Sequence, residues 1–295
     1  MKNNIAVARL WHKLGKYEYF CLKQLIETFP DLQFDFHIVL DQDMHHDEWT
    51  AKILDLNLNL KTYSKEFMQS YAKIYDIDLQ QYDFNKFIHF YHILIGHYLR
   101  RVEMYDYMLT YEYDIIFNTV DLKEVQECLI DRISFGIHEP DNANCDKALL
   151  NQICQLYQTD ITSILKTNNM NLLGCNAGFQ GISLKLFDEF ISKSGFDTML
   201  SIFDFDGIYK KDGTEKWGWE RTVFDTQEQS FYSLMNQLYS SEFKILNTDK
   251  YFFAPCWDDF DGYIDRAMKS NIVHFTGHVK STRMFDIIEK SLQNG

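Results

Sequence analysis

The first forty residues carry a strand-like, then a helical, then again a strand-like pattern of hydrophobic positions. Residues 5–10 form a short apolar run that predicts a buried strand, and residues 34–40 predict a second strand. Between them, residues 16–29 place apolar side chains at helical spacing, and the pattern stops at Pro30. A strand–helix–strand opening favours a mostly parallel sheet with helices on both faces.

The rest of the chain continues this alternation. Residues 84–103 contain no proline and a single glycine, so they predict one long helix. Shorter patterns predict strands at 107–109, 133–138, 172–181, 244–246 and 271–275, and helices at 147–165, 184–200 and 225–239. Residues 203–223 are polar, aromatic and glycine-containing, and predict a long loop over an active face. The whole pattern predicts one α/β domain with a mixed sheet.

Composition and charge narrow the class of partner. The 295 residues are 46% apolar and 24% charged, which is enough to bury a sizeable core and excludes a disordered chain. Acidic residues outnumber basic ones by 43 to 29, so the net charge is −14 and nucleic acid is excluded as the expected main partner. A local basic pocket for a small phosphorylated ligand stays compatible with this surface.

The same composition predicts a cytoplasmic protein. The first twenty residues lack the apolar core of a signal peptide, and no run approaches the ~18 apolar residues of a membrane span. Peripheral contact with a membrane is left open. Six cysteines lie far apart without a CxxC pair, which predicts reduced thiols in the core.

The first candidate for chemistry is the acid pair Glu112-Tyr113-Asp114, which follows a predicted strand. Residues at i and i+2 of an extended chain point to the same side, so both carboxylates can face one ligand. Near the carboxyl ends of parallel strands such a pair can hold a divalent cation against a diphosphate. Taken alone, such a pair is more typical of two solvated acids at the end of a strand.

A second candidate, His274-Phe275-Thr276-Gly277-His278-Val279-Lys280, follows the last predicted strand. The imidazole of His274 can supply a nitrogen ligand to the same cation. Gly277 lets the backbone approach an anion closely, and Lys280 offers a compact positive charge for a phosphate. A core histidine and a solvated lysine are the structural alternatives.

Two further motifs are polar at positions where a ligand can lie. Asn176-Ala177-Gly178 combines an amide with small residues, which suits either a ligand against the backbone or a tight strand with a bulge. Asp225, Glu228 and Gln229 open a predicted helix. The two acids suit either a capping box or groups that face a reacting sugar.

In chain order, these motifs resemble the nucleotide-sugar glycosyltransferases of the GT-A fold, and H-x-x-G-x-x-K is most similar to glycosyltransferase family 8. The resemblance runs from residue 5 to about Lys280, and four short motifs carry it. It implies a single domain with a central mixed, mostly parallel sheet flanked by helices. Residues 1–120 form its nucleotide-sugar-binding half, 121–283 its acceptor-side half and 284–295 a C-terminal helix.

The resemblance also implies a reaction and its site. A sugar would move from a nucleotide-diphosphate sugar, with a UDP-sugar favoured, to a hydroxyl of a glycan or glycoconjugate, and retention of configuration is favoured. The cofactor is a divalent metal, with Mn2+ favoured and Mg2+ as the alternative. Carried over residue by residue, the family pattern assigns the metal to Glu112, Asp114 and His274, and the diphosphate to Gly277 and Lys280. It assigns the donor sugar and the acceptor side to Asn176 and Gly178, and the nucleobase and ribose to Ala6, Val7, Ala8 and Arg9. Catalytic positions near the transferred sugar fall to Asp225, Glu228 and Gln229.

The sequence departs from the family pattern at three places, one of which is Ser281-Thr282 after Lys280, where the family has Pro-Trp. Glu112 is one methylene longer than the aspartate expected there, so it can contact the metal directly, hold the ribose or act through water. An arginine expected on the preceding helix has Lys86, Arg100 and Arg101 as candidates.

Two other functions stay open. The same fold can serve a catalytically inactive carbohydrate-binding protein. A sugar nucleotidyltransferase would need a glycine-rich phosphate loop, which residues 6–10 do not offer.

Overall fold

The computed structural model describes residues 4–11, 14–40, 47–82, 84–118, 121–138, 155, 158, 175–195, 231–232, 235–236, 238–246, 251–254 and 270–275. Among them, seven strands form one sheet in the order β3-β2-β1-β4-β7-β6-β8. In chain order these strands are β1 (Ile5–Trp11), β2 (Phe34–Leu40), β3 (Asn59–Ser64), β4 (Tyr107–Tyr111), β6 (Ser134–His138), β7 (Cys175–Ser183) and β8 (Phe243–Leu246). Every neighbouring pair is parallel except the two pairs that β7 makes, with β4 and with β6. The expected mixed, mostly parallel sheet is confirmed.

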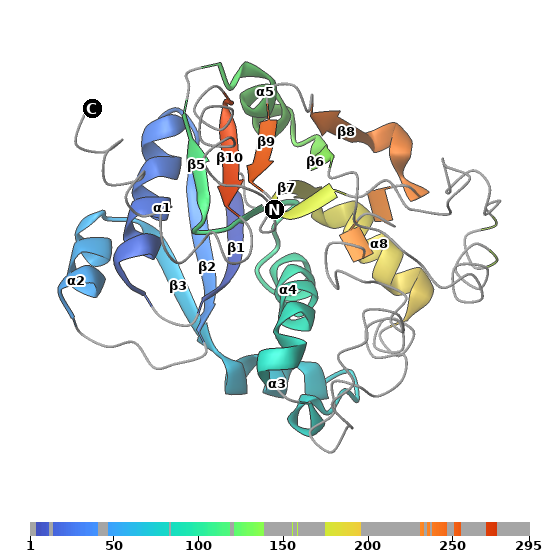
Figure 1. The fold of residues 1–295 in the computed structure, drawn as a ribbon. Helices are drawn as coiled ribbons and strands as arrows, with labels where there is room; N and C mark the ends of the chain where they lie inside the picture. Colours follow the sequence, from blue (N-terminus) through green and yellow to red (C-terminus); the bar gives the residue numbers. More distant parts are fainter. Residues whose placement is uncertain are drawn as a thin grey trace.

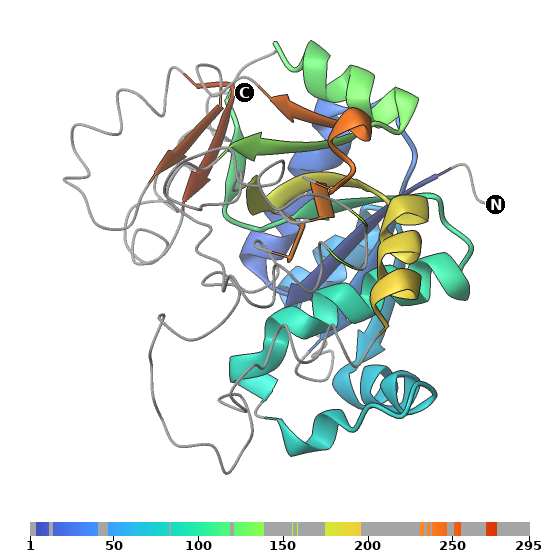
Figure 2. The same ribbon diagram turned by 90° about the vertical axis from the view of Figure 1, so that its right-hand side faces the viewer.

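A second, small sheet stands beside the carboxyl end of β4 (Figures 1 and 2). It has the order β5 (Ile115–Phe117), β10 (Ile272–Phe275) and β9 (Tyr251–Ala254). β10 runs antiparallel to β5 and parallel to β9. Because β5 follows β4 after a short turn, this sheet brings the last described strand of the chain next to the acid pair.

Helices cover both faces of the large sheet. The described helices are α1 (Lys16–Thr28), α2 (Glu48–Asp55), α3 (Lys65–Lys73), α4 (Phe84–Arg101), α5 (Lys123–Asp131) and α8 (Leu184–Ser194), with the short 3-10 turns η1 (Leu79–Gln81) and η2 (Ser240–Glu242). No helix in the described part of the chain is both long and apolar enough to cross a membrane.

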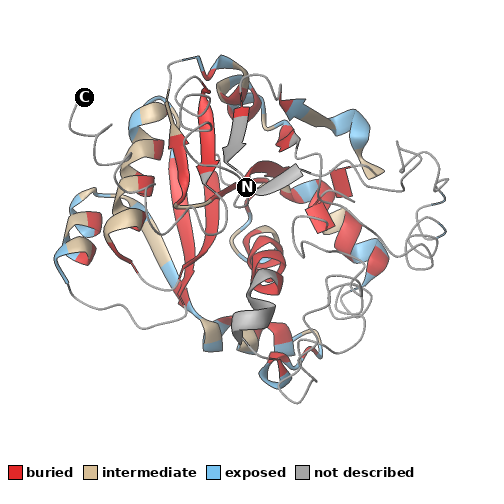
Figure 3. Ribbon diagram, in the orientation of Figure 1, coloured by how far each residue is buried: buried red, intermediate tan, exposed pale blue. Residues whose placement is uncertain are grey.

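The alternation of side chains along β1 divides the core into two. Ala6 and Ala8 belong to a buried cluster that includes residues of α3, α4 and α8. Val7 and Trp11 belong to the opposite cluster, which includes residues of α1 and α5. The buried colour accordingly runs along the central strands and the inward sides of the helices (Figure 3). Helices therefore cover both faces of the sheet, and the accessible place for a ligand is at the ends of the strands.

Most strongly patterned elements lie where the sequence predicts them, with small differences at their ends. α1 ends at Thr28, just before Pro30, and α4 ends at Arg101. α8 ends at Ser194, before the predicted end at residue 200, because Gly195 leaves the helical conformation with φ 77°. The predicted helix at 284–295, the loop at 203–223 and most of the predicted helices at 147–165 and 225–239 lie outside the described residues.

Candidate functional site

The acid pair lies in the turn that joins the large sheet to the small one. β4 occupies the middle of the seven-stranded sheet and ends at Tyr111, so Glu112 and Asp114 follow its carboxyl end directly. His274 lies on β10, where it pairs in register with Ile115, the first residue of β5. This pairing places the imidazole opposite the turn. Residues 160 positions apart in the sequence therefore meet at one edge of the sheet.

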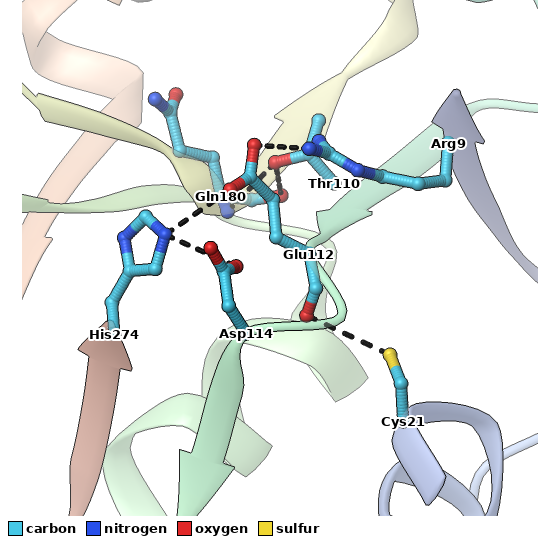
Figure 4. A network of polar contacts seen from close by, with 7 residues as sticks. All are labelled: Arg9, Cys21, Thr110, Glu112, Asp114, Gln180 and His274. Atoms are coloured by element: carbon cyan, nitrogen blue, oxygen red, sulfur yellow. Dashed lines mark hydrogen bonds and ion pairs between the residues drawn. The ribbon is translucent and has the colours of Figure 1, made fainter. Parts of the chain in front are cut away.

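The three side chains converge on a single point (Figure 4). His274 Nε2 lies 3.1 Å from Glu112 Oε2 and 3.2 Å from Asp114 Oδ1. One ligand atom from each residue lies within 4.8 Å of the others. Asp114 is fully buried, His274 is 4% exposed and the Glu112 side chain is 14% exposed. The structure thus brings together the three residues that the sequence proposed as metal ligands.

The electrostatic balance at His274 favours its charged form. Burial lowers the pKa of the imidazole, but the neighbouring Asp114 and Glu112 carboxylates outweigh it and raise the pKa to about 9. The imidazole therefore carries its second proton at neutral pH and pairs with both acids. Histidine binds metals as the neutral imidazole, so a cation bound at this point must displace that proton.

The chemistry of the three groups fits a hard divalent cation. Carboxylate oxygens are the ligands that Mg2+ and Mn2+ favour, and an imidazole nitrogen is accepted beside them. The two acids come from one short turn and the histidine from a paired strand, so strand pairing holds all three before any ligand arrives.

Arg9 is a fourth member of the cluster. It lies near the carboxyl end of β1, the neighbour of β4, and its Nη2 donates to Glu112 Oε1. Glu112 therefore bridges two partners, Arg9 through one oxygen and His274 through the other. The sequence grouped Arg9 with Ala6, Val7 and Ala8 as nucleotide-binding residues; these three are at most 2% exposed and fill the core. Their contact with a nucleotide stays a prediction.

Two of the three candidates for the expected helix arginine lie away from the acid pair, and the side chain of the third, Lys86, is outside the described part of the structure. Arg100 pairs with Asp106 and Arg101 with Asp188. Asp106 lies just before β4, at the end opposite to the acid pair. The two arginines of α4 therefore do not take the role suggested for them, and the arginine found at the acid pair is Arg9.

The Asn176-Ala177-Gly178 motif lies beside the acid pair, as part of β7. Glu112 donates its backbone N–H to the carbonyl oxygen of Gly178 at 2.8 Å. The next residue, Phe179, pairs in register with Tyr111 of β4. Gln180 donates its backbone N–H to Thr110 Oγ1 at 3.0 Å. The backbone of this motif thus fixes the start of the acid turn from the side of β7.

Two side chains of helix α1 also hydrogen-bond to the acid turn and to the residues on either side of it, and the sequence did not predict these contacts. The Cys21 thiol donates to the carbonyl oxygen of Glu112 at 3.6 Å. Gln24 Nε2 donates to Tyr111 Oη at 2.7 Å and to the carbonyl oxygen of Ile115 at 3.1 Å, while its Oε1 accepts from the N–H of Phe117 at 3.3 Å. Both polar side chains lie one turn apart on α1, and that spacing is the only signal of this role in the sequence.

The remaining predicted site residues are not placed. Asp225, Glu228, Gln229, Gly277 and Lys280 lie outside the described residues, and the Asn176 side chain does too. Their roles stay predictions.

Comparisons with known proteins find similarity among solved structures. No protein-family model and no curated protein matches the sequence. Among solved structures, the bifunctional glycosyltransferase WbbM matches 99% of this chain at a TM-score of 0.50 and 11% identity, and the match spans 52% of WbbM. Mouse xyloside xylosyltransferase 1 matches 94% of this chain and 99% of its own at a TM-score of 0.48 and 13% identity. The galactosyltransferase LgtC, solved with donor and acceptor sugar analogs, matches 98% of this chain and 96% of its own at 0.45 and 13% identity.

The match to WbbM bears on the architecture of the chain. At 11% identity, the likeness to WbbM shows a shared fold, and it confirms the GT-A type α/β domain expected from the sequence. Function has to be argued from the site.

Proposed function

We propose that the protein is a metal-dependent glycosyltransferase. It moves a sugar from a nucleotide-diphosphate sugar, with a UDP-sugar favoured, to a hydroxyl of a glycan or glycoconjugate. The observation that carries this proposal is the buried cluster of Glu112, Asp114 and His274 at the carboxyl end of the central strand β4. That edge is where open α/β sheets bind their ligands, and the fold is one that glycosyltransferases use.

The cluster would hold a divalent cation, with Mn2+ favoured and Mg2+ as the alternative. Asp114 and His274 offer buried ligand atoms, and Glu112 offers Oε2 because its other oxygen meets Arg9. When bound, such a cation neutralises charge that develops on a diphosphate leaving group. In the proposed reaction Lys280 and Gly277 contact the same diphosphate, and the lysine contact strengthens as the leaving group gains charge.

The donor sugar lies on the side of β7 in this proposal. Gly178 has no side chain and its carbonyl group contacts the N–H of Glu112, so a sugar can approach the backbone closely there. Asn176 supplies an amide that can donate to and accept from sugar hydroxyls.

The transfer itself demands little covalent work from the protein. Asp225, Glu228 and Gln229 are proposed to face the transferred sugar and to orient the acceptor hydroxyl. The similarity to family 8 favours retention of configuration. Excluding water from the buried cluster strengthens every charged contact within it.

Donor hydrolysis tests the proposal. The wild-type chain is incubated with UDP-, GDP- and other nucleotide sugars, with and without manganese, and release of the nucleoside diphosphate is measured. A glycosyltransferase releases it slowly without acceptor and only with metal. Release of pyrophosphate from a nucleoside triphosphate and a sugar phosphate would instead identify a nucleotidyltransferase.

Thermal shift separates the remaining alternative. Ligands that bind the folded state raise the melting temperature. Stabilisation by a free glycan, with no nucleotide sugar bound or hydrolysed, would identify a carbohydrate-binding protein without catalysis.

A further inference from the structure

The guanidinium of Arg9 is buried and has more hydrogen-bonding capacity than the described residues use. The residue is 7% exposed, and its Nη2 donates to Glu112 Oε1. Its Nε and Nη1 are buried and have no hydrogen-bond acceptor among the described residues. An unsatisfied charged donor in the interior is costly, so an acceptor is expected at this position.

The charges around Arg9 indicate an anionic acceptor. Glu112 and Asp114 carry two negative charges and Arg9 carries one positive charge, which leaves one negative charge on the three residues. A divalent cation bound with a neutral His274 makes the cluster net positive. Bare cation is therefore repelled by Arg9, whereas an anion that completes the coordination of the cation is attracted to both. Phosphate oxygens are the usual partners that complete such a site.

We propose that Arg9 is an anion-binding residue of the donor site, with Nε and Nη1 donating to phosphate oxygens of the donor diphosphate while Nη2 holds Glu112. This assignment rests on the proposed function, and it moves Arg9 from the nucleobase to the diphosphate. The planar guanidinium suits it, because its N–H groups point outward along separate edges and can serve a carboxylate and a phosphate together. Arg9 thereby couples the two ligands: it weakens binding of the cation alone and strengthens binding of the diphosphate.

A purely structural ion pair makes a different prediction. If Arg9 only positions Glu112, its loss would weaken binding of the cation and of the diphosphate together. If Arg9 binds the diphosphate, its loss weakens the diphosphate and tightens the cation. The two effects have opposite signs, so binding measurements separate the two roles.

The experiment is isothermal titration of the full chain with Mn2+ alone, with inorganic pyrophosphate and with UDP, the last two at saturating Mn2+. Arg9→Met keeps an unbranched apolar stem and removes the charge. We expect it to weaken pyrophosphate and UDP by about 10- to 100-fold, the loss of one or two charge-assisted contacts, and to tighten Mn2+ alone. Arg9→Lys keeps the charge without the planar fork, and we expect an intermediate loss.

Two further variants make the result decisive. Arg100→Met removes an arginine that pairs with Asp106 at the opposite end of β4, and we expect no change in any of the three affinities. Glu112→Gln frees Arg9 from its carboxylate, and we expect tighter binding of pyrophosphate without metal. Unchanged pyrophosphate affinity in folded Arg9→Met, or in Arg9→Lys if the methionine variant does not fold, overturns the proposal. Failure of donor hydrolysis with these affinities as expected would instead overturn the proposed function alone.

Discussion

Asp114→Asn is the substitution that best tests the acid pair as a metal site. Asp114 is fully buried, and its Oδ1 lies 3.2 Å from His274 Nε2. The amide has almost the same shape as the carboxylate, so packing is preserved while one negative charge is lost. Any change in cation affinity therefore reports charge and not the loss of the turn.

The size of the effect follows from that distance. At an effective dielectric constant of about 20, the 3.2 Å between Asp114 Oδ1 and His274 Nε2 corresponds to about 5 kcal/mol for opposite unit charges, and a divalent cation that replaces the His274 proton is attracted to Asp114 by at least as much. The amide oxygen keeps part of this attraction as a dipole, so a loss of about 2 to 4 kcal/mol is expected, which is about 30- to 1,000-fold in Mn2+ affinity. Glu112→Gln should cost less, because Arg9 already offsets the charge of Glu112.

The assay is Mn2+ titration followed by donor hydrolysis across a manganese series. Asp106→Asn is the matched control, since the half-exposed Asp106 precedes the same strand at its other end and pairs with Arg100. The control should bind manganese like the wild type. Wild-type affinity and wild-type hydrolysis in Asp114→Asn would refute the reasoning and leave the acid pair with a structural role only.

Three further predictions concern packing at Gly181, the pH dependence of stability and the role of Lys280. Gly181→Ala should lower the free energy of unfolding by about 1–3 kcal/mol or more, because a Cβ there would lie 1.9 Å from Tyr107 Oη and 2.5 Å from the Phe135 ring. An unchanged midpoint of urea unfolding would contradict this prediction. Burial lowers the pKa of His97 to about 4, whereas in the unfolded chain it is ~6.5. Below pH 6.5 the unfolded chain therefore binds a proton that the folded protein does not, and the free energy of unfolding should fall towards pH 4 by up to about 1.4 kcal/mol per pH unit. Denaturant titrations should show that His97→Gln flattens this slope, and an equal slope in both proteins would exclude His97 as its source. Lys280→Ala should lower kcat/KM by about 10- to 1,000-fold with little change in melting temperature, and unchanged steady-state kinetics would remove Lys280 from the site.

The parts of the fold that the sequence predicts well are those with an unambiguous period. β1 and β2 are buried on both faces, so apolar residues dominate both strands, and α1 shows a helical stripe that ends before a proline. The acid pair and His274 were proposed for one cation because two carboxylates and an imidazole suit the same ion. The structure brings them together because β5, which follows the acid turn, pairs with β10.

Elements with mixed patterns escaped prediction. The sequence reading included none of α2, β3, α3, α5 and β9. β3 is an edge strand with the sequence NLKTYS, and only Tyr63 in it is buried, so no apolar run marks it. The short helices bury two or three residues each, too few to establish a period over a long window.

The contacts of Arg9 and Gln24 lie beyond local reasoning for a different reason. Arg9 and Glu112 are 103 positions apart, and Gln24 reaches residues about 90 positions away. These contacts exist because β4 joins β1 directly in the sheet, although two strands and four α-helices separate them in the chain. Strand order is a property of the whole domain, so a motif scan finds the acids but not the residues that hold them.

The geometry also explains why a glutamate suits position 112. Its carboxylate spans from Arg9 of β1 to His274 of β10, one oxygen to each, while its backbone N–H is fixed by Gly178 of β7. A side chain shorter by one methylene, starting from the same fixed backbone, would lie farther from one of these partners. With its extra methylene, the Glu112 carboxylate contacts β1 of the large sheet and β10 of the small sheet. These two contacts lie at the point where the proposed cation and diphosphate meet.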